Sequence, residues 1–97
     1  MKILAIEKDV VGFRKNELDA TLLRQEAMRA WELQQSGRIR EMYFRADKPL
    51  AILILECDST DQAKEILSTL PLVRDGIIEF EIIPLVAYSG FQRLFKK

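Results

Sequence analysis

A single carboxylate, Glu26, stands where the surrounding sequence predicts an apolar surface. On a helical wheel at about 100° per residue it falls between Leu33 and Ala30, within an arc of apolar side chains. A carboxylate on that arc points into the domain, and burying it unpaired would be strongly unfavourable. Desolvation raises the pKa of a carboxyl group toward the range useful for general acid/base catalysis near neutral pH. The alternative is an ion pair between Glu26 and Arg38 or Arg40.

Arg40 and Tyr43 follow this segment and are three positions apart, so a regular strand places them on opposite faces. Only one of them then shares a pocket with Glu26, unless a bulge intervenes. A functional Tyr43 would donate a hydrogen bond to a carbonyl or enolate oxygen, and a functional Arg40 would hold a carboxylate. The alternatives are a tyrosine at the core edge and a solvated or ion-paired arginine. Trp31, on the inner arc, is either a core residue or a platform for a ligand.

The other candidate groups carry less chemistry. Glu79 and Glu81 share a strand face, where they either divide their pKa values as an acid and a base or lie at a solvated rim. Glu7 and Glu56, at strand ends, are treated in the same way. Cys57 has no histidine in the sequence to activate it and is expected to be a small buried hydrophobe.

No cofactor or metal is predicted. The sequence has no cluster of His, Cys or carboxylates with the spacing of a metal site. Its four glycines are scattered, so no glycine-rich phosphate loop is present. Formal net charge is zero and the aromatic strand motif that stacks RNA bases is missing, so nucleic acid is not an expected partner.

Period-two patterns and apolar runs predict four strands, at about residues 2–9, 38–46, 50–57 and 77–83. The turn signal Asp47-Lys48-Pro49 joins the second and third strands as a hairpin, and Asp75-Gly76 precedes the fourth. These strands must position Tyr43 and Arg40.

Helical periodicity predicts one helix from Asn16 to Ser36, capped by Asn16 and ended by Gly37. A second helix opens at Ser59, which forms a capping box with Gln62, and is expected to close at Pro71. Its apolar face is made by residues at i, i+3, i+4 and i+7: Ala63, Ile66, Leu67 and Leu70.

The predicted order is β-α-β-β-α-β, an α+β fold of the ferredoxin-like kind with a four-stranded antiparallel sheet. The 97 residues are enough for one domain, 1–97, in which 85–97 form a tail. Aromatic residues in the tail recur at i, i+3 and i+7, which predicts a helical turn capped by Ser89: Tyr88, Phe91 and Phe95.

The third predicted strand indicates self-association. It is apolar on both faces, with Ala51, Leu53 and Leu55 on one and Ile52 and Ile54 on the other. Two helices cover only one face of the sheet, whereas a second copy of the sheet would cover the other. We therefore expect a homodimer, with the tail packing on the partner. The alternative is a monomer whose tail covers its own sheet.

Location is predicted to be cytoplasmic. The one cysteine allows no intrachain disulfide, and the apolar start of the chain is too short for a signal-peptide core. No apolar run approaches the roughly 18–20 residues of a membrane span. No membrane partner is expected.

These residues resemble the muconolactone isomerase-like branch of the dimeric α+β barrel proteins. The segment from Glu26 through Trp31 to Gly37-Arg38-Ile39-Arg40 carries the resemblance, together with Tyr43, the helix opened by Ser59 and Leu70-Pro71-Leu72-Val73. It covers residues from about 18 to 84. The resemblance implies two protomers that put their sheets together, in some members within rings of dimers.

The resemblance also implies an activity: the named enzyme shifts a double bond in an unsaturated lactone by proton transfer without a metal. It assigns the acid/base role to a helix carboxylate resembling Glu26. Sister branches include haem-degrading enzymes, but the absence of histidine here excludes a haem held by a protein imidazole.

The sequence thus predicts a pocket between the first helix and the sheet for a small, partly apolar organic acid, lactone or enone. If it is catalytic, Glu26 is the acid/base, Tyr43 the hydrogen-bond donor, and Arg40 and Trp31 bind substrate. A non-catalytic ligand-binding or interaction protein, with Glu26 in an ion pair, is the main alternative. A cofactor-free monooxygenase acting on a quinol-like substrate is a third.

Overall fold

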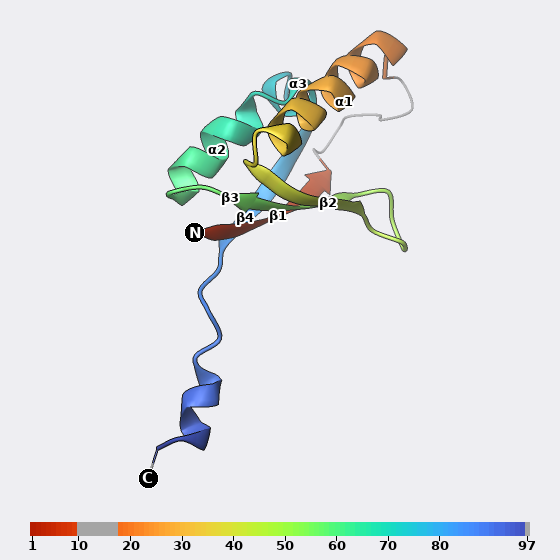
Figure 1. The fold of residues 1–97 in the computed structure, drawn as a ribbon. Coiled ribbons are helices and arrows are strands. Elements are labelled where there is room, and N and C mark those ends of the chain that lie inside the picture. Colours follow the sequence, from red (N-terminus) through yellow and green to blue (C-terminus); the bar gives the residue numbers. More distant parts are fainter. Residues whose placement is uncertain (10–17, 97) are drawn as a thin grey trace.

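The protein is an antiparallel sheet with its helices on one face, seen in a computed structural model that describes residues 1–9 and 18–96 (Figure 1). The strands lie in the order β2-β3-β1-β4, and every neighbouring pair is antiparallel. Their bounds are Lys2–Asp9 (β1), Ile39–Phe44 (β2), Ala51–Glu56 (β3) and Ile78–Pro84 (β4). The predicted β-α-β-β-α-β ferredoxin-like order is confirmed. None of the helices within the described residues has the length and apolar character needed to cross a membrane.

The first helix, α1 (Ala20–Gln35), begins four residues later than predicted. Asp19 is its N-cap, since the Asp19 side chain accepts a hydrogen bond of 3.0 Å from the Thr21 amide. Asn16, the predicted cap, lies outside the described residues. The helix ends as expected: Ser36 is the C-cap and Gly37 follows with φ +83°, a conformation that favours glycine.

The second helix, α2 (Thr60–Ser68), begins at the predicted capping box. The Ser59 hydroxyl accepts from the Gln62 amide at 3.1 Å, and the Gln62 side chain accepts from the Asp58 amide at 2.6 Å. The two ends of the box therefore satisfy backbone donors on both sides of the helix start.

Pro71 does not simply close α2, as predicted, but starts a further short helix, α3 (Pro71–Arg74). Proline suits the first helical position because its missing N–H would have no partner there and its φ is already helical. Leu70, the N-cap of α3, has no side-chain acceptor to offer to the first turn.

The hydrophobic core lies between the helices and one face of the sheet. Leu33 of α1 and Ile66 of α2 are buried there against residues of the central strands. The core members are Ile3, Ala5, Leu33, Ile39, Leu53, Leu55, Cys57, Ala63, Ile66, Leu67 and Leu70. Ile78 is buried and Phe80 and Ile82 are partly buried, so these residues of β4 face the helices.

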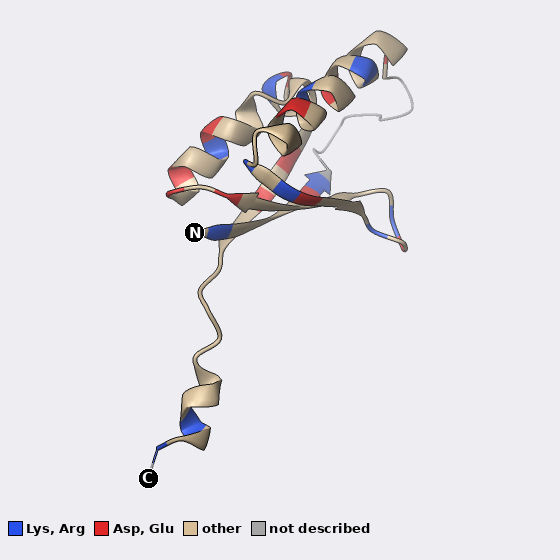
Figure 2. Cartoon of the chain, in the orientation of Figure 1, with Lys and Arg blue, Asp and Glu red and all other residues tan. Residues whose placement is uncertain are grey.

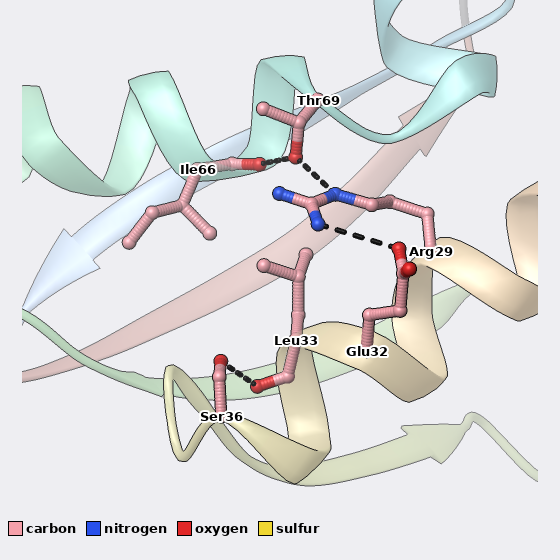
Figure 3. A network of polar contacts seen from close by, with 6 residues as sticks. All are labelled: Arg29, Glu32, Leu33, Ser36, Ile66 and Thr69. Carbon is pink, nitrogen blue, oxygen red and sulfur yellow. Dashed lines mark hydrogen bonds and ion pairs between the residues drawn. The ribbon is translucent and has the colours of Figure 1, made fainter.

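Polar contacts hold α1 beside the end of α2 (Figure 3). Arg29 Nε donates to Thr69 Oγ1 at 2.9 Å, and Arg29 Nη1 lies 3.4 Å from Glu32 Oε1. Thr69 in turn donates to the Ile66 carbonyl at 2.6 Å. This network helps to fix the helix that carries Glu26 relative to the rest of the helical layer.

The opposite face of the sheet, which we call the open face, is covered by none of the helices α1, α2 and α3 (Figure 1). The registers Leu4↔Ile54 and Ile6↔Ile52 bring apolar side chains from β1 and β3 side by side there. Ile83 of β4 pairs with Leu4 and extends this apolar strip. The prediction that β3 is apolar on both faces is confirmed.

The tail, residues 85–96, runs away from the domain on the open-face side of the sheet (Figure 1). It ends in a short 3₁₀ helix, η2 (Gly90–Leu94), so the predicted helical turn is present. Ser89 is its N-cap residue, as predicted, but the Ser89 side chain makes no capping hydrogen bond. Most of the tail is uncharged, with basic residues toward its end (Figure 2). Its large side chains are exposed: Val86, Tyr88, Phe91, Leu94 and Phe95.

Candidate active site

A largely apolar cavity of about 440 Å³ lies between α1 and the sheet. Both α1 and α3 contribute to its walls, and all four strands contribute to its floor. The described lining residues are Glu7, Leu23, Glu26, Ala27, Ala30, Trp31, Gln34, Met42, Phe44, Ala51, Leu53, Leu70, Leu72, Ile78 and Phe80. This is the pocket that the sequence predicts between the first helix and the sheet.

Glu26 lies in this cavity, and its partner is a backbone amide. Leu72 N donates to Glu26 Oε1 at 2.9 Å. Leu72 is in the first turn of α3, where the amide has no intrahelical partner and the N-cap residue supplies no acceptor. Glu26 thus supplies from α1 the cap that α3 lacks. The expected ion pair with Arg38 or Arg40 is not the contact observed among the described residues.

Burial is the main reason that the pKa of Glu26 is raised above its ordinary value. The hydrogen bond from the Leu72 amide opposes this shift, because it favours the carboxylate. The nearby charge of Glu7 raises the pKa further, while that of Arg74 lowers it. Together these effects favour the neutral form of Glu26 more than water does. A group that both accepts and returns a proton near neutral pH needs a pKa shifted in this direction.

Glu7 also lines the cavity, so the solvated-rim alternative is wrong for this residue. It lies on β1 on the face that the helices cover and is only 6% exposed. Its Oε1 accepts a hydrogen bond of 3.0 Å from the Ala51 amide. The available signal was its period-two relation to Ile3 and Ala5. That signal was masked because Leu4 and Ile6 make the other face of β1 equally apolar.

Trp31 lines the cavity but is not a core residue. Its side chain is 58% exposed, as it lies where α1 meets the solvent. Leu23 and Phe44, also exposed, line the cavity with it. These three residues give the cavity an apolar mouth. Of the two alternatives for Trp31, the prediction that it is a buried core residue is wrong.

The structure does not bring Tyr43 or Arg40 to the cavity of the same chain, which corrects the expected shared pocket. The β2–β3 register shifts between Ile39 and Glu41, so a bulge occurs at Arg40. Beyond the bulge Met42 faces the helices and Tyr43 faces outward, where it donates to Glu41 Oε1 at 2.7 Å. This acceptor raises the pKa of Tyr43.

Arg40 lies in a separate hollow near the start of the chain, with Met1 and Glu56 among its neighbours. Its Nε donates to the Gly37 carbonyl at 2.8 Å, which holds the side chain close to the end of α1. In this position it contacts neither Glu26 nor the described wall of the cavity.

The remaining candidates lie outside the cavity. Glu79 and Glu81 are exposed on the open-face side, and Glu79 is 4.0 Å from Lys8 Nζ, as expected for a solvated rim. Cys57 is buried, and burial raises the pKa of its thiol, so it is not an activated nucleophile. The described residues contain no cluster of three or more His, Cys, Asp or Glu suited to a metal.

The geometry supports proton transfer on a bound molecule. A carboxyl group with a raised pKa reaches an apolar space large enough for a small organic ligand, and one of its oxygens is held by a backbone amide. An apolar wall also favours burial of a small ligand over its hydration.

Comparison with known proteins gives the family and the fold. The family model described as muconolactone delta-isomerase matches residues 9–90. A crystal structure of muconolactone isomerase is similar with a TM-score of 0.74 at 19% identity, over 93% of both chains. The 5-chloro-2-hydroxyhydroquinone dehydrochlorinase of Burkholderia phenoliruptrix AC1100, solved with 2,5-dihydroxybenzoquinone, gives a TM-score of 0.59 at 16% identity, over 93% of this chain and 98% of that one. No sequence among the curated proteins matches.

Proposed function

Because this chain belongs to the muconolactone delta-isomerase family, we propose that it is a cofactor-free isomerase that moves a proton next to the carbonyl of a small lactone or enone. The observation that carries the proposal is Glu26, a carboxyl group of raised pKa in an apolar cavity beneath α1. We also propose that the protein is located in the cytoplasm.

The reaction needs one group that takes a proton and gives it back. The Glu26 carboxylate removes a proton from the saturated carbon at one end of the allylic system, the γ-carbon of a conjugated lactone such as muconolactone or the α-carbon of an enol-lactone, and the C–H electrons form a conjugated enolate. The protonated Glu26 then delivers a proton to the far carbon of the conjugated system, and the double bond moves into its new position. No electrons are gained or lost, so the step needs no oxidant or reductant.

The cavity wall positions the substrate in this proposal. Trp31 and Phe44 would pack on the planar ring of a lactone at the mouth. Burial in an apolar space strengthens the interaction between Glu26 and the carbon acid, because water does not compete. Neither Tyr43 nor Arg40 reaches this wall, so the proposal gives them no contact with substrate bound in the cavity of their own chain.

The hydrogen bond between Glu26 and Leu72 supports a second candidate function. If Glu26 serves only to cap α3, the cavity is a binding site without chemistry and the protein is a ligand-binding module. This candidate accounts for the Leu72 contact equally well. It does not require the carboxyl group to change its protonation state.

Substitution of Glu26 by glutamine separates the two candidates. The amide oxygen of Glu26→Gln can still accept from Leu72 N, but it cannot act as a base. We expect wild-type protein to isomerise muconolactone or a related enol-lactone, followed by proton NMR in deuterated buffer, and Glu26→Gln to lose turnover while staying folded. Glu65→Gln, an exposed carboxylate on α2, is the matched control and should keep full activity.

If folded wild-type protein neither isomerises any lactone of the panel nor introduces deuterium into it, the isomerase proposal is wrong and the binding candidate stands. Turnover that survives in Glu26→Gln would instead remove Glu26 from the chemistry.

We further propose that the functional unit is a homodimer formed through the open face. The apolar strip of Leu4, Ile6, Ile52, Ile54 and Ile83 would be covered by the same strip of a second copy. The tail, whose apolar side chains contact little of their own domain, would pack on the partner (Figure 1).

A further inference from the structure

The proposed isomerisation develops negative charge on an oxygen while Glu26 takes up the proton. When the C–H bond breaks, its electrons spread into the conjugated system and the carbonyl oxygen becomes an enolate oxygen. A hydrogen-bond donor held at that oxygen stabilises the transition state, and the effect is large in a site from which water is excluded. Tyr43, the donor expected from the sequence, faces outward and does not line the cavity, so it does not supply this hydrogen bond within its own chain.

Two side chains in the described wall of the cavity carry a neutral N–H group, the amide of Gln34 and the indole of Trp31. The other uncharged side chains of this wall are hydrocarbon groups or, at Met42, a thioether, which donates no hydrogen bond. The backbone amides of Ala51 and Leu72 already donate to carboxyl groups. The candidates for the donor in the described wall are therefore Gln34 and Trp31.

Glu26, Ala30 and Gln34 form one row along α1, because residues four positions apart on a helix are neighbours on its surface. All three line the cavity. At a rise of about 1.5 Å per residue, the Cα atoms of Glu26 and Gln34 are about 12 Å apart. Side chains of a helix lean toward its N-terminus, which directs Gln34 over the turn that holds Ala30. Since Ala30 has only a methyl group, the row leaves room for a small ring between the carboxyl group and the amide.

The side-chain amide of Gln34 is available to a ligand. Gln34 is exposed, and its backbone carbonyl accepts the Gly37 amide at 3.1 Å, whereas its side chain has no partner among the described residues. Trp31 is a poorer candidate. It lies five residues from Glu26, outside the row, and an indole that packs flat on a ring directs its N–H within its own plane, past the ligand.

We propose that Gln34 is a second catalytic residue of this site, whose side-chain amide donates a hydrogen bond to the carbonyl oxygen of a bound lactone or enone as that oxygen becomes an enolate. The Glu26 carboxyl group acts on the C–H bond, and the Gln34 amide acts on the oxygen. The amide keeps its proton throughout, so the proton balance of the reaction is unchanged. The inference rests on the proposed function, because it assigns a further group to the same site.

Replacement of Gln34 by methionine tests the role in turnover. Methionine has a similar length and helix propensity but no N–H. Because the hydrogen bond strengthens as charge develops, we expect kcat for the isomerised lactone to fall about 100-fold, with a much smaller change in KM. Gln35→Met is the matched control, since Gln35 is exposed and outside the described wall, and it should keep the wild-type kcat. An unchanged kcat in folded Gln34→Met, or a loss confined to KM, would overturn the proposal.

Equilibrium binding gives a second test that requires no turnover. The probes are tetronic acid, a five-membered lactone whose enol is ionised at neutral pH, and 2(5H)-furanone, the corresponding lactone without that hydroxyl group. We expect Gln34→Met to weaken binding of tetronate about tenfold and to change binding of the furanone much less, because a hydrogen bond to an anionic oxygen is the stronger one. Calorimetry or NMR titration measures both affinities. Equal losses for the two probes, or no loss for tetronate, would contradict the proposal.

Gln34→Glu serves the same tests if Gln34→Met does not fold. It keeps the shape of glutamine but replaces the donor with an anionic acceptor, so both kcat and tetronate affinity should fall at least as far. Isomerisation that depends on Glu26 but not on Gln34 would refute only this inference. If wild-type protein does not isomerise any lactone, the proposed activity is wrong, and the tetronate titration still decides whether Gln34 recognises an enolate oxygen.

Discussion

At the scale of single residues, Glu26 combines two roles that different substitutions separate. Its carboxyl group accepts the Leu72 amide of α3, and it also presents an ionisable group to the cavity. Glutamine retains the first role and abolishes the second, whereas alanine abolishes both. The side chain therefore contributes to stability through the hydrogen bond that one of its oxygens accepts. In the proposed mechanism it contributes to turnover through its change of protonation.

Glu26→Ala is expected to destabilise the protein by about 1 kcal/mol relative to Glu26→Gln, since loss of a helix cap typically has that effect. Alanine leaves the Leu72 amide without its acceptor, and glutamine does not. Urea denaturation of the two variants, compared at the same pH, measures the difference. Equal stabilities would show that the α3 cap contributes little.

The stability of the wild-type protein relative to Glu26→Gln should depend on pH in a defined direction. The folded-state pKa of Glu26 lies above its ordinary value of 4.5, so between these two values the folded protein holds a proton that the unfolded chain has lost. The wild-type advantage is therefore fully present below about pH 4.5 and is lost as pH rises through the folded-state pKa. Thermal denaturation of both proteins across this range gives the difference, and an advantage that grows with pH would contradict it.

The contrast between Glu26 and Glu7 shows what a sequence reveals about single residues. The helical period around Glu26 is unambiguous, so its position on the inner face could be predicted. Its partner could not, because a backbone amide 46 residues away leaves no trace in residue types. The buried position of Glu7 could not be predicted, because alternation cannot assign a residue to one face where both faces of a strand are apolar.

At the scale of elements, the bulge in β2 decides which side chains reach the cavity. One extra residue at Arg40 changes the phase of alternation, so that Met42 and Phe44 face the helices beyond it. No sequence pattern marks this bulge, so the sequence could not decide whether Arg40 or Tyr43 faces the helices. Asp19 and Pro71 show a similar limit. Asn16 carries the same capping signal as Asp19, and a proline is as typical of the residue after a helix as of the first residue in one.

Gly37→Ala should test how tightly the junction between α1 and β2 is specified. Gly37 has φ +83°, so a side chain there is expected to cost about 1–2 kcal/mol of unfolding free energy. Gly37→Asn should cost less, because asparagine tolerates this conformation better. Chemical denaturation of both variants gives the comparison, and a neutral Gly37→Ala would mean that the junction relaxes.

At the scale of the whole molecule, two apolar surfaces are left uncovered by the described residues of the chain. The open face presents its strip on the central strands, and the tail presents exposed aromatic residues beyond the sheet (Figure 1). Both surfaces were predictable from residue types. How a second copy meets them was not, since a sequence does not encode a partner's orientation in any local pattern.

Ile54→Lys should convert the proposed dimer into a folded monomer. Ile54 lies at the centre of the open face, where a lysine is solvated in a monomer but buried in a dimer. Sedimentation velocity reports the mass, and circular dichroism checks the fold. Glu65→Lys, on the exposed side of α2, is the matched control and should leave assembly intact. An unchanged mass for Ile54→Lys would place the interface elsewhere.

Removal of residues 85–97 is expected to weaken assembly while the domain remains folded. The tail leaves the sheet after Pro84, with the Leu85 amide bonded to the Lys2 carbonyl at 3.0 Å, and its large side chains lie outside the core. A dilution series of the truncated protein should show dissociation at higher concentration than the full chain. A loss of secondary structure instead would show that the tail supports its own domain.

The hydrogen bond between Leu72 and Glu26 also provides a spectroscopic reporter within the protein. A neutral carboxyl oxygen is a weaker acceptor than a carboxylate, so the Leu72 amide proton senses which form is present. Its chemical shift and hydrogen-exchange rate should follow the titration of Glu26 in real time, in the free protein and in its complexes. A single backbone resonance thereby reads the state of the cavity without any label on the ligand.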